Sequence, residues 1–272
     1  MKNLLFSAAI GDISGMPYEF NANKDYRSIV LVRSDNDYTD DTVCTFACAE
    51  ALLNNIDVAQ NLWQRCRGDI KRGYGSGFRK WIKADTLQPP YQSFGNGSAM
   101  RASSAGFLAT SVEECTHLAT LLAAPTHDHP EGIKGSVATA LAVFYAVQGH
   151  DKDFIRANVL DKFYPEWSNR SYYSIKETYA FEVTCQKSVP PALISFLEST
   201  DYQDCLLLTI ALGGDADTLA AISGPVAYAY YRFMPQYLIN NALIKLPKWM
   251  LELNEDFDER CSGNFKERVA AK

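Results

Sequence analysis

The sequence has no uninterrupted apolar run of 18 residues, and its basic residues are in the minority. The most apolar region, residues 205–234, is interrupted by Gly213, Gly214 and Asp215, so no membrane-spanning helix is expected. The 26 Lys and Arg residues are outnumbered by 32 Asp and Glu residues, and the net charge is −6. Nucleic acids and anionic membranes are therefore not expected as partners, because the chain has no overall positive field to attract them.

Paired cysteine motifs are also lacking. The seven cysteines are an odd number, are scattered, and never stand at C-x-x-C spacing, which predicts reduced thiols and a cytoplasmic protein. Residues 4–10 are largely apolar, but this run is too short for a signal sequence and meets Gly11 and Asp12 instead of a cleavage site. We therefore expect these residues to belong to the mature protein.

Alternating strand patterns are scarce, and apolar segments of helical length are separated by short loops rich in Gly, Asp, Asn and Pro. This predicts an all-α protein, organised as a single domain over residues 1–272, in which four buried helices pack together. The helices are expected at 42–53, 135–148, 205–212 and 218–233, the last kinked at Pro225. Residues 29–32 could be a strand, a buried helix or a loop. We expect helices with a partly exposed aromatic surface at 152–193 and a polar tail at 255–272.

Three acidic segments stand beside apolar ones. Residues 39–42 (TDDT) and 214–218 (GDADT) precede expected helices, and capping of the free amides of the first helical turn explains either one by itself. A phosphatase-type D-x-D motif would require a strand before Asp215, whereas residues 206–212 are expected to be helical. The third segment, residues 11–19, contains two further carboxylates.

These six carboxylates flank apolar elements that share one core, so their ends can converge; they are Asp12, Glu19, Asp40, Asp41, Asp215 and Asp217. Two carboxylates about 4 Å apart repel by about 4 kcal/mol at an effective dielectric constant of about 20, more than helix capping recovers. Bound cations would remove this repulsion. Carboxylate and hydroxyl oxygens suit hard ions such as Mg²⁺, Mn²⁺ or Ca²⁺, and two ions can share a bridging carboxylate.

Two further segments are polar. Residues 95–101 (GNGSAMR) form a glycine-flanked loop whose amides and arginine suit an anion, although a simple Asn-Gly turn is an alternative. Residues 126–131 (THDHPE) contain two of the four histidines but lack the spacing of a zinc site. They form either a capped turn before the next helix or a place where a neutral imidazole hydrogen-bonds a substrate hydroxyl or phosphate.

Taken in the order in which they stand in the chain, the five segments resemble the motifs of the ADP-ribosylglycohydrolase family. The matching stretches are GDISGMPYE, TDDT, GNGSAMR, THDHPEGIKGS and GGDADTLAAISG, between residues 11 and 224. The resemblance implies a compact, orthogonal multi-helix bundle, a pair of Mg²⁺ ions with Mn²⁺ as an alternative, and hydrolysis of the glycosidic bond between ADP-ribose and its acceptor. It also implies an ADP-ribosylated protein or small acceptor as partner and ADP-ribose as product.

The resemblance also assigns roles to residues. It implies that the metal ligands are Thr39, Asp40, Asp41, Asp215, Asp217 and Thr218, with Asp217 bridging both ions. Asp40 and Asp41 are expected to take part in catalysis together with Glu19, which could deprotonate the attacking water or gate access. Substrate contacts are implied for His127 and for Gly95, Asn96, Gly97, Ser98, Ala99, Met100 and Arg101. Asp12 is expected to be structural or to lie behind the metal ligands. The aromatic that stacks on adenine is open among Tyr91, Phe94, Tyr172 and Tyr173.

Two departures from the family pattern leave the linkage open. Arginine-directed bacterial members tend to carry Asp where this chain has Gly95, which resembles the serine-directed branch, and many members have Pro where Ser104 stands. N-glycosidic and O-glycosidic bonds are therefore both candidates. Two other functions also stay open: a non-catalytic ADP-ribose-binding protein of the same fold, and a hydrolase of a related ADP-ribose derivative.

Overall fold

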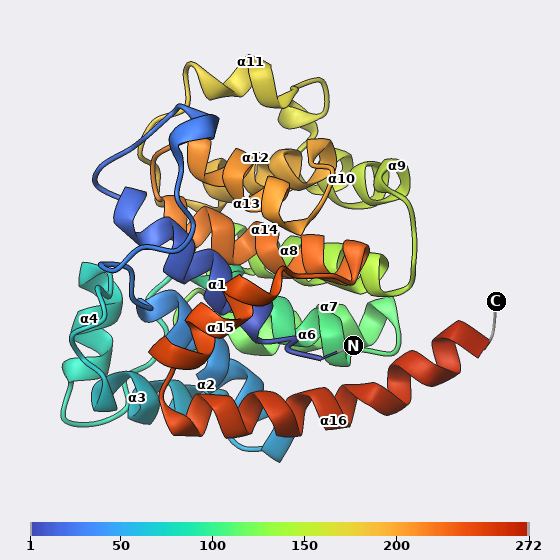
Figure 1. The fold of residues 1–272 in the computed structure, drawn as a ribbon. Helices are drawn as coiled ribbons and strands as arrows, with labels where there is room; N and C mark the ends of the chain where they lie inside the picture. Colours follow the sequence, from blue (N-terminus) through green and yellow to red (C-terminus); the bar gives the residue numbers. More distant parts are fainter. Residues whose placement is uncertain (1, 271–272) are drawn as a thin grey trace.

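The molecule is a bundle of helices (Figure 1). A computed structural model describes the backbone of residues 2–270 and the side chains of residues 2–262. Within that region there is no β-strand, although Gly95 and Thr184 form an isolated antiparallel bridge. The predicted all-α class is confirmed. The helices are α1 (Phe6–Gly15), η1 (Met16–Tyr18), η2 (Tyr26–Ser28), α2 (Asp40–Asn54), α3 (Val58–Gly68), α4 (Ser76–Lys83), α5 (Gly97–Met100), α6 (Ser103–Leu108), α7 (Val112–Ala123), α8 (Pro130–Val147), α9 (Lys152–Ile155), η3 (Arg156–Leu160), α10 (Asp161–Phe163), η4 (Pro165–Trp167), α11 (Tyr172–Lys176), α12 (Cys185–Glu198), α13 (Tyr202–Ala211), α14 (Ala216–Tyr231), α15 (Gln236–Lys245) and α16 (Lys248–Ala270).

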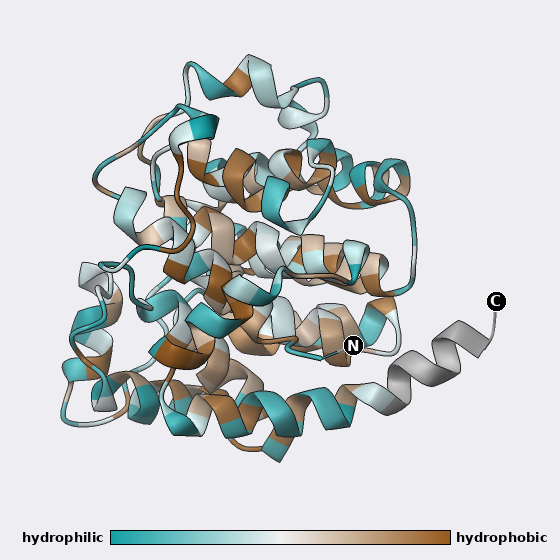
Figure 2. Cartoon of the chain, viewed as in Figure 1, coloured by the Kyte–Doolittle hydropathy of each residue, from teal (hydrophilic) through white to brown (hydrophobic). Residues whose placement is uncertain are grey.

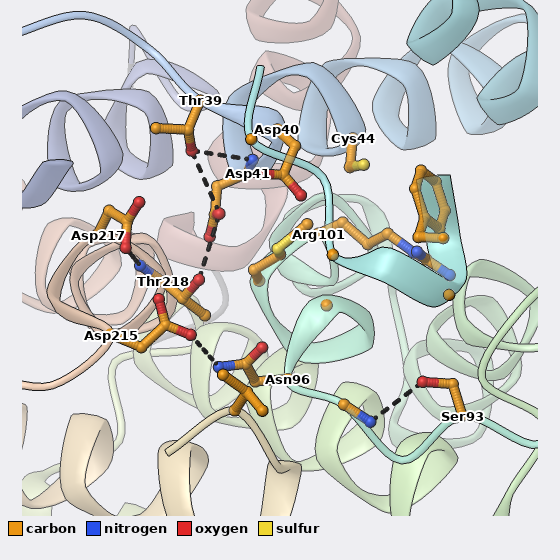
Figure 3. Close-up of a pocket in the computed structure, with 18 of the residues that line it drawn as sticks. Thr39, Asp40, Asp41, Cys44, Ser93, Asn96, Arg101, Asp215, Asp217 and Thr218 are labelled. Atoms are coloured by element: carbon orange, nitrogen blue, oxygen red, sulfur yellow. Dashed lines mark hydrogen bonds between the residues drawn. The ribbon is translucent and has the colours of Figure 1, made fainter. Parts of the chain in front are cut away.

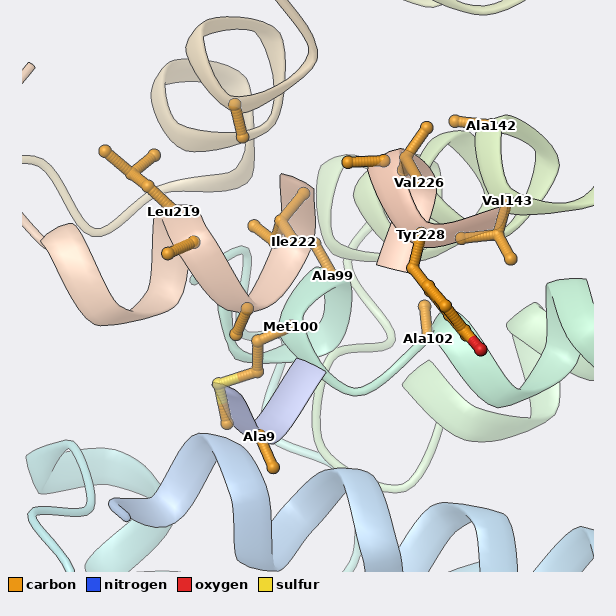
Figure 4. Packing of buried hydrophobic residues seen from close by; sticks show 14 of the residues in the cluster. Ala9, Ala99, Met100, Ala102, Ala142, Val143, Leu219, Ile222, Val226 and Tyr228 are labelled. Carbon is orange, nitrogen blue, oxygen red and sulfur yellow. The ribbon is translucent and has the colours of Figure 1, made fainter. Parts of the chain in front are cut away.

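Helix α14 lies at the centre of the bundle (Figure 1). Residues 216–229 of this helix are all buried, as expected for a segment that is apolar on all sides. Helices α1, α2, α8, α12 and α13 contact α14, so the four helices predicted from the sequence meet there. Figure 4 shows Leu219, Ile222 and Val226 of α14 among small residues of the neighbouring helices. The functional segments are therefore attached to a close-packed core.

Glycines let α1 approach α14 closely. A Cβ atom on Gly11 would lie 2.2 Å from the Ala220 carbonyl oxygen, and one on Gly15 would lie 2.5 Å from the Cα atom of Asp217. On α14 itself, a Cβ atom on Gly224 would lie 2.5 Å from the Ser7 carbonyl oxygen. Only glycine permits such a backbone approach, and the contact at Gly15 fixes the start of α14 against the end of α1.

The predicted polar tail at 255–272 is wrong for the residues whose side chains are described. Residues 248–270 form α16, and Met250, Leu253, Phe257 and Cys261 are buried. Their spacing of three and four residues makes one apolar stripe on a helix that is otherwise polar, which is visible as alternating brown and teal in Figure 2. Residues 255–272 are polar on average, so the apolar stripe is not evident from their composition alone. Residues 271–272 lie outside the described region.

The predictions of the individual helices are largely confirmed, with shifted boundaries. The four expected helices correspond to α2, α8, α13 and α14. Residues 29–32 lie in a loop, and 152–193 hold short helices in which Tyr164 and Tyr172 are buried while Tyr173 is exposed. All seven cysteines are free thiols. Within the described part of the chain, no helix has both the length and the apolar character needed to span a bilayer.

Candidate active site

The first acidic segment is the start of α2. Thr39 is the N-cap residue, and its Oγ1 accepts a hydrogen bond of 3.3 Å from the backbone N–H of Asp41. Asp40 and Asp41 occupy the first turn, where negative charge is favourable at a helix N-terminus. The backbone N–H of Asp40 donates to the Arg72 carbonyl at 2.8 Å, which anchors the turn to the following loop.

The second acidic segment is the start of α14. Gly213 and Gly214 both have φ near +75°, the left-handed conformation that ends α13 and turns the chain into α14. Asp215 follows as the N-cap, and its Oδ2 accepts from Asn96 Nδ2 at 2.7 Å. Because α13 is a helix that ends in this glycine cap, Asp215 does not follow a strand, as a phosphatase-type motif would require.

These two helix starts meet. Thr218 Oγ1 donates to Asp41 Oδ2 at 3.2 Å, although the two residues are separated by 177 positions in the chain. Carboxylate oxygens of Glu19, Asp215 and Asp217 lie within 4.8 Å of one another. Figure 3 shows Thr39, Asp40 and Asp41 facing Asp215, Asp217 and Thr218 across this point. The predicted convergence of the acidic segments is therefore present in the structure.

The clustering raises the pKa values of the carboxyl groups. Burial raises the pKa of Asp41 and Asp217 well above the usual range, and nearby carboxylates raise them further. The pKa of Glu19 is raised to about 7, first by burial and then by the negative charges of Asp215 and Asp12. The cluster repels itself when ionised, and a divalent cation would neutralise that repulsion.

The donor atoms fit a hard metal ion. The buried Asp41 Oδ1 has no hydrogen-bond partner among the described residues, which is costly for a carboxylate oxygen. The surrounding groups are carboxylates and threonine hydroxyls, the oxygen ligands that Mg²⁺, Mn²⁺ and Ca²⁺ accept. The acidic cluster can therefore bind a metal ion.

Asp12 lies behind this cluster and organises it. Its buried carboxylate accepts hydrogen bonds from the backbone N–H and the hydroxyl of Thr39, at 2.9 and 2.8 Å, and from both corresponding groups of Thr42. These bonds tie α1 to the start of α2. Because the Thr39 hydroxyl gives its proton to Asp12 and accepts one bond from the Asp41 N–H, one lone pair of its oxygen is left to ligate a metal ion.

A cavity of about 420 Å³ extends from the acidic cluster to the loop that begins α5. Gly95, Asn96, Gly97, Met100 and Arg101 line it, but Ser98 and Ala99 do not. The Ser98 hydroxyl donates to the Gly132 carbonyl at 2.7 Å, and Ala99 packs into the core (Figure 4). The side chains of Ser98 and Ala99 thus face away from the cavity, which corrects the expectation that every residue of this loop contacts substrate.

Arg101 also differs from its expected role. The side chain is completely buried, and its Nε and Nη2 donate to the Leu122 carbonyl at 3.1 and 2.9 Å. Nη2 donates to Thr126 Oγ1 at 2.8 Å as well. These two nitrogens hold the end of α7 and are not available to a substrate anion, whereas Nη1 has no partner among the described residues. In Figure 3 the side chain extends away from the carboxylates.

His127 stands beside the same loop. It is 4% exposed, lines the cavity, and its Nδ1 lies 2.7 Å from Thr126 Oγ1. A Cβ atom on Gly97 would lie 3.3 Å from Nε2, so glycine there leaves room for the ring. Burial, with the positive charge of Arg101, lowers the pKa of His127 well below its usual value. The imidazole is therefore neutral near pH 7.

Several cavity-lining residues had no signal in the sequence. They are Phe20, Arg72, Phe78, Phe181 and Val183. Each stands in a loop or short helix without a recognisable motif, so only the folded arrangement identifies it. Of the four aromatics left open for adenine, only Tyr91 lines the cavity, and Tyr172 is buried elsewhere with its hydroxyl donating to the Leu208 carbonyl.

Comparison with known proteins agrees with this arrangement. The human ADP-ribosylhydrolase ARH3 is 28% identical, over 85% of each chain. The ADP-ribosyl-[dinitrogen reductase] glycohydrolase of Rhodospirillum rubrum is also 28% identical, over 71% of this chain and 68% of its own. A solved structure titled ADP-ribosylglycohydrolase-related protein complex shares the fold, with a TM-score of 0.71 at 21% identity over 95% of this chain and 94% of that one. Residues 1–267 match the family model described as ADP-ribosylglycohydrolase, and the chain therefore belongs to the ADP-ribosylglycohydrolase family and is a glycohydrolase.

Proposed function

We propose that this protein hydrolyses, in a magnesium-dependent reaction, the glycosidic bond that joins ADP-ribose to a modified protein side chain or a small acceptor. The observation that carries the proposal is the meeting of the α2 and α14 starts with Glu19 at one end of the cavity. The relatives named for ADP-ribosyl hydrolysis support the same reaction.

Thr39, Asp40, Asp41, Asp215, Asp217 and Thr218 would hold two Mg²⁺ ions, with Asp217 shared between them. Mn²⁺, which accepts the same oxygen ligands, could take their place. When bound, such ions orient a water molecule and stabilise charge that develops as the glycosidic bond breaks. Asp12 and Asn96 keep the ligands in place, because they hydrogen-bond Thr39 and Asp215 respectively.

Glu19 is proposed to take the proton of the attacking water. Its carboxylate lies within 4.8 Å of donor oxygens of Asp215 and Asp217, and a pKa of about 7 suits proton transfer near neutral pH. Glu19 is also less buried than Asp41, Asp215 and Asp217, so it can reach water in the cavity. Asp40 and Asp41 are proposed to support the reaction by placing the metal ions.

The opposite end of the cavity is proposed to bind the diphosphate and nucleoside part of the substrate. Gly95 and Gly97 allow close backbone approach, and His127 faces the same space. Tyr91 and the stacked pair Phe20 and Phe181 line the cavity and offer aromatic faces to the base or to the acceptor. The linkage, N-glycosidic or O-glycosidic, is left to experiment.

The test is to incubate the protein with arginine-linked and serine-linked ADP-ribosyl peptides, with Mg²⁺ or with EDTA, and to quantify released ADP-ribose. We expect release from at least one peptide that stops in EDTA and returns when Mg²⁺ is added back. Release that is unaffected by EDTA would contradict the mechanism. Binding without release would favour an ADP-ribose-binding protein, and release only from a small ADP-ribose conjugate would favour the related hydrolase.

A further inference from the structure

Three buried polar side chains form a row that ends at the cavity. Arg101 Nη2 donates to Thr126 Oγ1 at 2.8 Å, and Thr126 Oγ1 lies 2.7 Å from Nδ1 of His127. Arg101 and Thr126 are 0% exposed and His127 is 4% exposed. The row joins the end of α5 to the turn between α7 and α8.

The row determines which nitrogen of His127 carries the proton. A guanidinium is only a donor, so Thr126 Oγ1 must be the acceptor in its bond with Arg101. The hydroxyl has one proton of its own, and within the described residues His127 Nδ1 is the remaining partner of this oxygen. Nδ1 therefore accepts the hydroxyl proton, and a neutral imidazole with an accepting Nδ1 carries its proton on Nε2.

The protonated nitrogen is turned toward the cavity. Cβ atoms built on Gly95 and Gly97 would lie 3.5 and 3.3 Å from Nε2, so this edge of the ring faces the glycine loop. Among the described residues Nε2 has no hydrogen-bond partner, and His127 lines the cavity. A donor that faces the cavity and has no protein partner is available to a ligand that supplies an acceptor.

Charge indicates what kind of acceptor fits. The recorded partners of the Arg101 guanidinium are two carbonyls and a hydroxyl, so within the described region its charge has no carboxylate counterpart. The carboxylates of the cavity are gathered at the other end, around Asp41 and Asp217. An anionic oxygen is therefore favoured beside His127, and in ADP-ribose the anionic oxygens belong to the diphosphate.

We propose that Arg101 and Thr126 are positioning residues that hold His127 as the neutral Nε2–H tautomer, so that the substrate contact which the family resemblance implies for His127 is a hydrogen bond donated by Nε2–H to a phosphate oxygen. The identity of the substrate rests on the proposed function, whereas the tautomer does not. An experiment can therefore reject the tautomer without rejecting the proposed substrate, or reject the substrate without rejecting the tautomer.

The tautomer is measured on the full-length protein by long-range ¹H–¹⁵N NMR correlation of the histidine rings, with the signals of His127 assigned from a His127→Gln variant. We expect Nε2 protonated and Nδ1 unprotonated in the wild type. A proton on Nδ1, or on both nitrogens, near neutral pH would overturn the proposal. This readout needs neither substrate nor turnover, so it stands even where no ADP-ribosyl peptide is cleaved.

The ligand is tested by adding ADP-ribose or adenosine, which lacks the phosphates, to the wild-type protein. We expect the Nε2–H proton signal to shift with ADP-ribose and to stay in place with adenosine. An equal response to both would reject phosphate as the acceptor. No response to a bound ADP-ribose would reject the hydrogen bond altogether.

The positioning role is tested with Thr126→Val, which removes the hydroxyl at similar volume, and with Thr126→Ser, which keeps it. We expect Thr126→Val to admit the Nδ1–H tautomer and to weaken ADP-ribose binding by about tenfold or more, while adenosine binding and metal-dependent thermal stabilisation stay unchanged. Thr126→Ser should restore both tautomer and affinity. A purely structural threonine would lower the melting temperature without altering the tautomer, and that result would overturn the proposal. Should Thr126→Val fail to fold, the wild-type spectra decide.

Discussion

The two ends of the cavity carry opposite charges, and within the part of the chain that the structure describes, each end lacks a counter-charge on a neighbouring side chain. At the metal end, carboxylates from the starts of two helices face one another with raised pKa values and no cation among the described residues. At the loop end, the buried guanidinium of Arg101 has no carboxylate partner in the same region, and His127 presents an unpartnered nitrogen. The two ends therefore favour ligands of opposite charge.

This difference shows how an acidic protein can bind a substrate that is itself anionic. The carboxylates that line the cavity lie at the end where metal ions would cover them, and the proposed phosphate site lies where the buried Arg101 and a glycine loop stand. The overall net charge of −6 therefore says little about the field inside the cavity. The predictions below test whether the two ends are independent.

The largest effect is expected for Asp217→Asn. Turnover should fall by more than about 100-fold, because the change removes a charged ligand, and Mg²⁺ should no longer raise the melting temperature. In EDTA the variant should melt about 2–4 °C above the wild type, because one buried negative charge has been removed. Binding of adenosine at the loop end should be unchanged. Activity and thermal melting, each with and without Mg²⁺, check these outcomes.

The matched control is Asp85→Asn, which changes an exposed aspartate that does not line the cavity. It should behave as the wild type in every assay. An Asp217→Asn enzyme that keeps its turnover would show that Asp217 is not a ligand.

Glu19→Gln should have the next largest effect. We expect the turnover number to drop by about 10²- to 10⁴-fold, because the amide cannot accept the proton of water, with ADP-ribose affinity and Mg²⁺-dependent melting retained. Steady-state kinetics and thermal melting separate the two quantities. Loss of the magnesium response would recast Glu19 as a metal ligand.

A smaller effect is expected from pH. Burial raises the pKa of Asp12 from 3.8 to about 6, and that of Glu19 from 4.5 to about 7. The folded protein therefore binds these protons more tightly than the unfolded chain. Without metal, the stability that these two carboxyl groups contribute should be fully present below about pH 4 and be lost as the pH rises to about 7. Thermal melting in EDTA between about pH 5 and about pH 8 measures this, and Mg²⁺ should reverse the loss at the upper end. The buried, neutral His127 contributes in the opposite direction, so the wild type is compared with Glu19→Gln in EDTA. A wild-type stability that does not fall relative to that of Glu19→Gln as the pH rises would contradict the charge repulsion at the metal end.

The smallest effect is expected for Gly97→Ala at the loop end. The added methyl group would lie 3.3 Å from His127 Nε2, so the ring must shift, and ADP-ribose affinity should fall by about 3- to 10-fold. The magnesium response should not change. Gly68→Ala, which meets no atom within 4 Å, is the control. A weaker magnesium response in Gly97→Ala would show that the two ends are coupled.

The metal end could be predicted from sequence because its chemistry is local. The segments TDDT and GDADT each contain a helix-capping pattern and two carboxylates. Five residues or fewer are therefore enough to predict each helix start. What could not be read was the spatial arrangement. The meeting of Asp41 with Thr218 depends on the glycine contacts between α1 and α14, which join residues about two hundred positions apart.

The loop end was harder to predict because its chemistry is not local. In the sequence, the Arg101 guanidinium suited an anion. Its partners Leu122 and Thr126 stand 21 and 25 positions away, at the end of α7 and in the turn that follows, and no sequence pattern indicates the contact. A buried arginine that bonds carbonyl groups has the same sequence signature as one that binds phosphate. Asp12 was assigned a supporting role correctly, although only the structure reveals that four donors converge on it.

The contact between α16 and the start of α1 joins two segments that lie far apart in the sequence. Asn254 and Asp258 of α16 accept hydrogen bonds from the backbone N–H groups of Leu5 and Leu4, which open α1. The buried amides at the start of α1 are therefore satisfied only when α16 is in place. Since α1 also carries Asp12, which accepts hydrogen bonds from Thr39 and Thr42 at the start of α2, loss of α16 is expected to disturb the acidic cluster.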